Sequence, residues 1–176
     1  MKLLPALAAA AVSFAFAIPA VAATTLFGAH LTGAAESPPN ASNAFGDAQV
    51  TLDDILFTVA VHVSFNDLSV PATAGHIHCC TAVPGVGNIG VSVGFAGFPA
   101  AVSGTYDNTF VLSNAAFTTL RTGIQEGRSY VNIHNGNFPG GEIRGFLAPV
   151  PEPSTYALML AGLGLAGLAA RRRRVG

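Results

Sequence analysis

The sequence predicts an all-β domain, a sandwich or Greek-key barrel, between two apolar terminal segments. The first observation is a strict alternation over residues 57–65, which is typical of a half-buried strand. Its apolar face is formed by Phe57, Val59, Val61, Val63 and Phe65. The second observation is that Gly-, Pro- and Asn-rich turns separate this segment from others like it. Short strands punctuated in this way indicate a sandwich or barrel.

Eight strands and one short helix are expected between residues 24 and 149. The predicted strands are 25–33, 45–52, 57–65, 75–80, 89–95, 105–112, 129–134 and 142–148. One or two helical turns are predicted at 114–126, where Ser113 or Asn114 is a suitable cap and Gly127 a suitable stop.

Composition and charge exclude two classes of protein. The chain has 176 residues, of which 51% are hydrophobic and only 10% are charged. Residues 24–149 contain three arginines against eight acidic residues. Such a surface has no basic patch to neutralise phosphates, so we expect no nucleic-acid partner. Intrinsic disorder is disfavoured because the apolar content is high and regularly spaced.

Residues 1–23 have the organisation of a secretory signal peptide. Lys2 is followed by an almost purely apolar run, and Ala20-Val21-Ala22 supplies small residues for signal peptidase. The alternative is a first transmembrane helix, which the short run and its closing Pro19 disfavour. We therefore expect export across the inner membrane.

Residues 150–176 have the features of a second targeting segment. Pro151-Glu152-Pro153 precedes an apolar run, 156–170, and the chain then continues with Arg171, Arg172, Arg173 and Arg174. As a helix the run is about 22 Å long, shorter than the roughly 30 Å of a hydrocarbon core. It predicts a single, weak transmembrane helix with its arginines in the cytoplasm. A short span suits a temporary anchor.

This C-terminal segment resembles the PEP-CTERM sorting signal of Gram-negative bacteria. The triplet, the Ala/Gly/Leu helix and the basic cluster stand in the family's order. The resemblance implies cleavage near the triplet by an exosortase, a membrane transpeptidase, often alongside exopolysaccharide production. It therefore implies a transient inner-membrane anchor, followed by the cell envelope, the outer surface or the medium. An ordinary C-terminal anchor is the alternative.

Residues 24–149 resemble the CHRD domain of secreted proteins. The matching pieces are Leu31-Thr32-Gly33-Ala34-Ala35-Glu36-Ser37-Pro38-Pro39, Gly75-His76-Ile77-His78, Tyr130-Val131-Asn132-Ile133-His134 and Phe138-Pro139-Gly140-Gly141-Glu142-Ile143-Arg144-Gly145. The resemblance implies an immunoglobulin-like or superoxide-dismutase-like β-sandwich and no established activity. The adjacent cysteines at 79 and 80 depart from the family pattern.

Three histidines form the sharpest candidate site. His76 and His78 are two residues apart, so they point to one face of a strand. His134 ends another alternating segment, and His62 is a possible fourth ligand. If the two strands are neighbours, the imidazoles suit zinc or copper. The alternative is that these histidines make structural hydrogen bonds.

Cys79 and Cys80 are adjacent and are expected to lie outside the cytoplasm, where disulfides can persist. They are expected to form a vicinal disulfide or to remain a free pair; intermolecular bridges and soft metal ligation are the other options. Glu142 and Arg144 are expected to form a local ion pair, and Glu142 orienting His134 is the alternative.

The sequence shows no catalytic set, such as a Gly-x-Ser-x-Gly elbow, and we expect no enzymatic activity. Two functions remain. The first is a non-enzymatic envelope or extracellular module with a binding, adhesion or matrix role, whose partners would be exopolysaccharide or envelope proteins. The second is an envelope protein that binds zinc or copper at the histidines.

Overall fold

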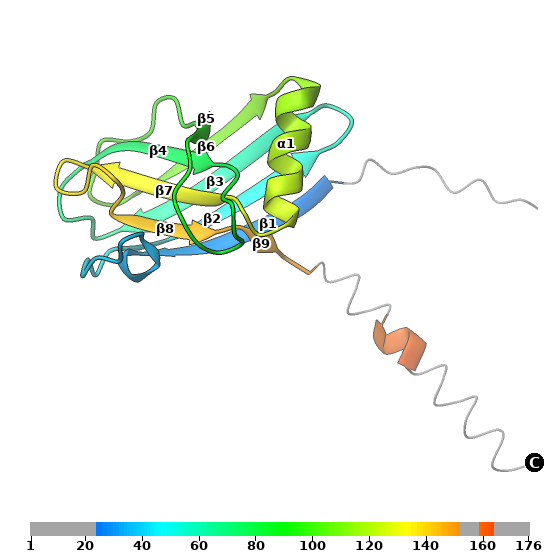
Figure 1. Ribbon diagram of the computed structural model, residues 1–176, viewed down its shortest axis with the longest axis horizontal. Coiled ribbons are helices and arrows are strands. Elements are labelled where there is room, and N and C mark those ends of the chain that lie inside the picture. Colours follow the sequence, from blue (N-terminus) through cyan, green and yellow to red (C-terminus); the bar gives the residue numbers. More distant parts are fainter. Residues whose placement is uncertain (1–23, 152–158, 164–176) are drawn as a thin grey trace, which may run out of the picture.

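The computed structural model describes residues 24–151 and 159–163. Residues 24–151 form nine strands, one α-helix and a 3₁₀ turn. Figure 1 shows how these elements are arranged. The strands are β1 (Thr24–Thr32), β2 (Phe45–Asp53), β3 (Thr58–Asn66), β4 (Ala72–His78), β5 (Val91–Gly94), β6 (Gly104–Val111), β7 (Tyr130–Asn135), β8 (Ile143–Phe146) and β9 (Ala148–Pro149), with α1 (Asn114–Gln125) and η1 (Gly33–Ala35). The predicted all-β class is confirmed.

All strand pairs are antiparallel and belong to one continuous sheet. Its order is β5-β4-β7-β8-β1-β2-β3-β6, and β9 adds a short pairing to β1. The sheet curls until its two ends meet: Phe95, directly after β5, stacks on Tyr106 of β6 with ring centroids 5.2 Å apart. The two layers of this sandwich-like fold are therefore parts of one sheet.

The core lies inside the curl and follows the period-two pattern of the strands. The buried side chains of β3 are Val59, Val61, Val63 and Phe65, and Ile77, Val131, Ile133 and Ile143 face them from the other layer. The helix closes one end of the curl with Phe117, Leu120 and Ile124. Their spacing of three and four residues places them on a single helix face.

The ends of α1 confirm the capping prediction. The Ser113 hydroxyl accepts a hydrogen bond from the Ala116 N–H at 3.3 Å, which satisfies one of the free donors of the first turn. Gly127 follows the helix with φ of 67°, the left-handed conformation that glycine adopts without steric cost.

Three details of the strand prediction are wrong. Phe57 is not part of the β3 stripe but lies in the β2–β3 turn, with φ of 52°. The segment predicted at 75–80 begins at Ala72 and ends at His78, so both cysteines follow the strand. The segment 142–148 is two strands, because the chain passes from pairing with β7 in β8 to pairing with β1 in β9.

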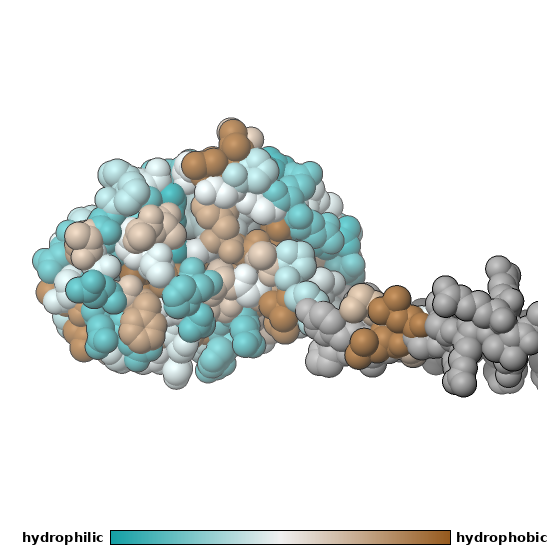
Figure 2. All heavy atoms as spheres, turned by 90° about the horizontal axis from the view of Figure 1, so that it is seen from below, coloured by the Kyte–Doolittle hydropathy of each residue, from teal (hydrophilic) through white to brown (hydrophobic). Residues whose placement is uncertain are grey.

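The terminal segments lie largely outside the described residues. The predicted signal peptide, 1–23, and residues 152–158 and 164–176 of the predicted sorting segment are not described. Residues 159–163 are helical and expose Met159, Leu160 and Leu163. Within the described part of the chain, no helix is both long and apolar enough to cross a membrane. On the domain face in Figure 2, polar and apolar atoms are interspersed.

Candidate metal centre

Neighbouring strands β4 and β7 position the three predicted histidines. In their antiparallel register, Ala74 lies opposite His134 and His76 opposite Asn132. His134 is therefore diagonal to His76 on the face that points away from the core, within reach of long side chains. The alternate residues Gly75 and Ile77 turn inward, so the His-x-His spacing places both imidazoles on this outer face.

The three imidazoles converge. Each offers a ring nitrogen, and these nitrogens all lie within 4.8 Å of one another. The ring centroids of His76 and His134 are 4.9 Å apart, and those of His76 and His78 are 5.6 Å apart. Zinc–imidazole bonds of about 2.0–2.1 Å require nitrogens roughly 3.4 Å apart around a tetrahedral ion. Small side-chain adjustments therefore suffice for all three to reach one ion.

Backbone carbonyls orient two of the rings. His78 Nδ1 lies 2.8 Å from the Ile89 carbonyl oxygen, and His134 Nδ1 lies 3.0 Å from that of Pro139. A carbonyl oxygen only accepts, so this hydrogen-bond network assigns the proton to Nδ1 in both rings. Each Nε2 then carries a free lone pair. Metal-binding histidines typically show this arrangement, in which the second nitrogen donates to a carbonyl.

Each of the three rings has one buried nitrogen that has no hydrogen-bond partner in the protein. His76 Nδ1, His78 Nε2 and His134 Nε2 are buried and make no hydrogen bond. A buried polar atom without a partner costs about 1–3 kcal/mol. A cation bound within the cluster can supply such a missing partner.

Burial keeps the cluster neutral. Burial and, to a lesser extent, the neighbouring charges of His134 and His78 together lower the pKa of His76 from 6.5 to about 4. Burial also lowers the pKa of His78 and of His134, although the carbonyls that accept from their Nδ1 atoms oppose the shift. Neutral imidazole is the form that binds metal ions, so no proton must leave at neutral pH.

Comparison with known protein families matches residues 27–147 to the CHRD domain. The chain belongs to the CHRD domain family. Residues 149–174 match the PEP-CTERM protein-sorting motif. Both resemblances seen in the sequence are confirmed, and together they make the chain an exosortase-sorted extracellular protein. No curated protein and no solved structure matches it.

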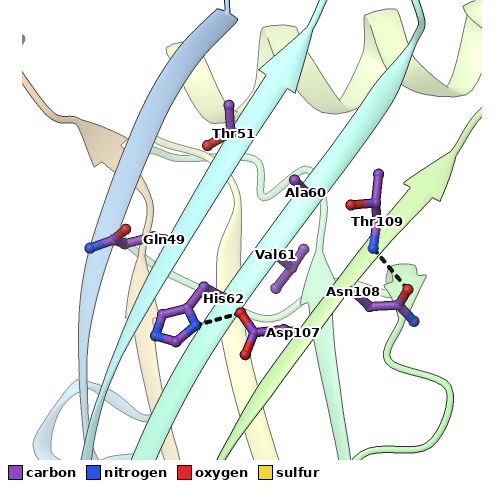
Figure 3. Close-up of a pocket in the computed structure, with 8 residues that line it drawn as sticks. All are labelled: Gln49, Thr51, Ala60, Val61, His62, Asp107, Asn108 and Thr109. Carbon is purple, nitrogen blue, oxygen red and sulfur yellow. Dashed lines mark hydrogen bonds and ion pairs between the residues drawn. The ribbon is translucent and has the colours of Figure 1, made fainter.

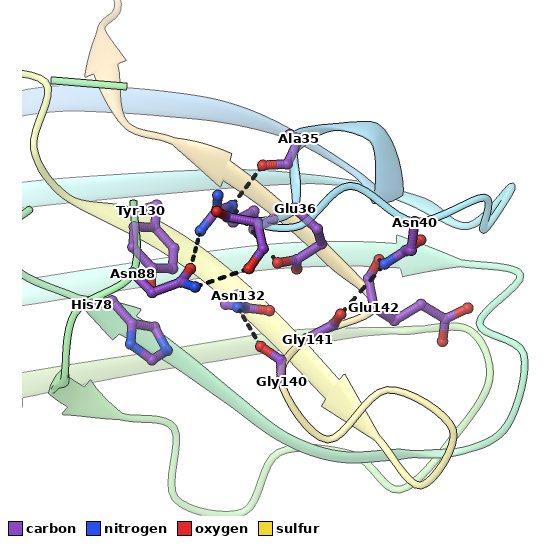
Figure 4. Close-up of polar contacts among 12 residues, drawn as sticks. Ala35, Glu36, Asn40, His78, Asn88, Tyr130, Asn132, Gly140, Gly141 and Glu142 are labelled. Carbon is purple, nitrogen blue, oxygen red and sulfur yellow. Dashed lines mark hydrogen bonds and ion pairs between the residues drawn. The ribbon is translucent and has the colours of Figure 1, made fainter. Parts of the chain in front are cut away.

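Within the CHRD domain, the buried Arg144 holds in place a loop that orients one of the three histidines. The Arg144 guanidinium donates to the carbonyls of Ala35 (2.6 Å) and Gly87 (3.0 Å) and to Asn88 Oδ1 (2.8 Å). Figure 4 labels two of these acceptor residues, Ala35 and Asn88. The Arg144 Cζ lies 4.8 Å from the centre of the Tyr130 ring, a cation–π contact. Arg144 thereby holds the loop 79–90 that supplies the Ile89 carbonyl.

Glu36 is the acid that faces this arginine. Its Oε2 lies 3.7 Å from Arg144 Nε, and its Oε1 is buried without a partner. Burial raises the pKa of the Glu36 carboxyl from 4.5 to about 7, against the opposing effect of the Arg144 charge. The sequence reasoning missed this pair because the two residues are far apart in the chain, although both lie in quoted CHRD motifs.

Glu142 takes neither role that was predicted for it. Glu142 precedes β8 and is fully buried. Its carboxylate accepts hydrogen bonds from the Ser42 hydroxyl at 2.6 Å, from the Ser69 N–H at 2.9 Å and from the Asn135 amide. Figure 4 shows its side chain directed away from Ala35, Glu36 and Asn88. It therefore fastens three loops together, and neither pairs with Arg144 nor orients His134.

His62 is not a fourth ligand. It lies on β3, where its Nδ1 is 2.7 Å from Asp107 Oδ1 of β6 in an exposed pair (Figure 3). The shallow pocket around it is lined by Gln49, Thr51, Asp107 and Thr109, among others. The converging group found among the described residues contains His76, His78 and His134 only. A strand pattern shows which face a residue occupies but not which strand lies beside it.

Cys79 and Cys80 are joined as a vicinal disulfide directly after β4. Both sulfur atoms pack against the helix at Gly123, where an added Cβ would lie 2.3–2.4 Å from them. Neither cysteine belongs to the converging histidine group. In the structure, the pair therefore connects the end of β4 to α1 rather than adding soft ligands to the cluster.

Proposed function

We propose that the CHRD domain of this exported protein is a non-enzymatic metal-binding module that holds one zinc or copper ion at His76, His78 and His134. One observation carries the proposal: the three imidazoles converge, with one ring nitrogen of each within 4.8 Å of the others. Each ring also has a buried nitrogen without a hydrogen-bond partner, and an ion bound in the cluster would offset part of that cost.

The donor set selects the class of ion. Neutral imidazole is a ligand for zinc and copper, whereas calcium and magnesium take oxygen ligands. Three protein ligands leave a further coordination position for water or another small ligand. We assign no reaction to that position, because the histidine cluster itself contains no carboxylate or nucleophile. Adhesion, a matrix role and binding of exopolysaccharide or envelope proteins stay predictions from the sequence.

Titration of the metal-free protein with Zn²⁺ or Cu²⁺ tests the proposal, with calorimetry as the readout. One ion should bind per chain, and the pair of substitutions His76→Ala and His78→Ala should lower the affinity at least 100-fold. The matched control is His30→Ala with His62→Ala, which removes two exposed histidines that pair with Asp47 and Asp107. This control should bind like the native chain.

Circular dichroism of each variant before titration shows whether the fold is retained. As a second readout, a saturating ion should raise the melting temperature of the native chain and of the control, because ligand binding to the folded state stabilises it. A folded His76→Ala, His78→Ala protein that binds as tightly as the native chain would contradict the proposal. So would a native chain that binds neither ion.

A further inference from the structure

Three of the most exposed aliphatic side chains of the domain lie at one end of the sheet. Ile55 and Leu56, in the β2–β3 turn, are 64% and 63% exposed, and Val111 at the end of β6 is 78% exposed. The register places them together: Asp53 pairs with Thr58 across the turn, and Thr58 pairs with Val111. We call Ile55, Leu56 and Val111 the apolar tip.

The turn is built to present its side chains outward. The Asp53 carboxylate accepts hydrogen bonds from the backbone N–H groups of Ile55 and Leu56, both at 2.8 Å. Asp54 forms an ion pair with Arg121 of α1 at 2.6 Å. These interactions satisfy two backbone donors and the Asp54 charge within the domain, whereas the two apolar side chains face solvent.

The sorting segment leaves the domain at this same end. The β9 strand pairs Ala148 with Gly28 and Pro149 with Phe27, so the chain runs toward the start of β1 as it leaves. Thr24, at that start, pairs with Asp53, the residue before the turn. Figure 1 shows the β2–β3 turn, α1 and the exit of the C-terminal segment at one end of the sheet.

The distance to the membrane is short. The apolar run of the sorting segment begins at Tyr156, five residues after Pro151. Five extended residues span at most about 18 Å. The turn between β2 and β3 lies about two to three strand spacings from β9, or roughly 12 Å at 4.8 Å per strand. A domain tethered this closely at one end keeps that end toward the lipid surface.

We propose that the apolar tip contacts the outer surface of the inner membrane while the sorting segment is anchored there. The occupant is the lipid interface itself, into which interfacial amphipathic helices bury their apolar side chains about 5–10 Å deep. The domain then has two attachments, its tip and its tail. This holds residues 151–153 at the bilayer surface, where a membrane transpeptidase acts. The inference rests on the sorting motif and is independent of the metal site.

Because the chain contains no tryptophan, one introduced tryptophan reports its own surroundings. The full chain with Leu56→Trp is reconstituted into vesicles through its C-terminal segment, with and without lipids brominated near the headgroup. We expect a blue-shifted emission and a loss of emission in the brominated vesicles. The matched control is Phe45→Trp, at the opposite end of β2 and 42% exposed. It should show neither effect.

A second variant separates lipid contact from simple proximity. In a chain carrying Val111→Trp, the further change of Ile55 and Leu56 to serine should reduce the quenching, because the remaining tip is less apolar. Equal quenching at positions 56 and 45 would overturn the proposal, as would emission at position 56 that is as water-exposed as at position 45. A blue shift at position 56 without quenching by brominated lipid would show a protein contact instead, and would also overturn it.

Discussion

The Tyr130 ring lies parallel to the His78 imidazole, with centroids 4.7 Å apart and an angle of 4° between the planes. On its other side the tyrosine contacts the Arg144 guanidinium, and its hydroxyl accepts a hydrogen bond from the Ile89 N–H at 3.3 Å. The carbonyl oxygen of this residue, Ile89, accepts a hydrogen bond from the His78 imidazole. Tyr130 therefore fixes both the ring and the loop that orients it.

Replacing Tyr130 should weaken metal binding without removing a ligand. Tyr130→Leu removes the stacked ring and the hydroxyl, and we expect the affinity for Zn²⁺ or Cu²⁺ to fall about 10-fold, the lower range for residues behind a ligand. Tyr130→Phe keeps the stack and should lose less. Calorimetric titration of both variants measures this. Equal affinity in Tyr130→Leu and the native chain would show that the stack does not position His78.

The carboxyl of Glu36 should make stability depend on pH. Its pKa is raised from 4.5 to about 7 in the folded chain, so the folded state holds this proton more tightly than the unfolded state. The stabilisation is fully present below about pH 4.5 and is lost as the pH rises through 7. Glu36→Gln removes this titration, because the amide is neutral at every pH.

The measurement is the difference in unfolding free energy between the native chain and Glu36→Gln. From pH 5 to pH 8 the native chain should lose stability relative to the variant, by on the order of 2 kcal/mol. Taking the difference removes the contributions of the buried histidines, which act in the opposite direction. A difference that is constant over this range would show that Glu36 keeps its ordinary pKa.

Gly123 is expected to tolerate no side chain. A Cβ there would lie 2.3 Å from Cys80 Sγ and 2.4 Å from Cys79 Sγ, so Gly123→Ala should destabilise the fold by about 1–3 kcal/mol. The cost of this steric clash outweighs the gain of up to about 1 kcal/mol that alanine brings over glycine within a helix. Gly90→Ala is the control, because open space surrounds that position. Denaturant unfolding of both variants decides; a Gly123→Ala chain as stable as the control contradicts the prediction.

The sorting motif predicts the fate of the precursor. Replacing Arg171, Arg172, Arg173 and Arg174 by serine, or Glu152 by alanine, should leave unprocessed chain at the inner membrane of its host. Glu126→Ala, a change of the same kind within the domain, should leave processing normal. Intact-mass measurement of the purified protein shows both cleavage points. Normal mature protein from both sorting variants would refute exosortase processing at this motif.

Sequence alone determined the local features of this chain. Alternation located the long strands to within a few residues, and Ser113 and Gly127 marked the ends of the helix, because these patterns depend on neighbours in the chain. The His-x-His spacing put His76 and His78 on one face for the same reason. The C-terminal sorting motif was recognisable from the sequence because it is defined by composition and by the order of its parts.

Only the tertiary structure decided which of these features meet. The pairing of β4 with β7 brings His134 close to His76. His62 lies on another part of the sheet, beside Asp107. Folding also buried Glu142 among serines and set Glu36 against Arg144 across more than a hundred residues. Strand periodicity is set by each backbone's own pleat, whereas strand order follows from packing the whole core. Local patterns therefore named the metal-site candidates, and long-range packing selected among them.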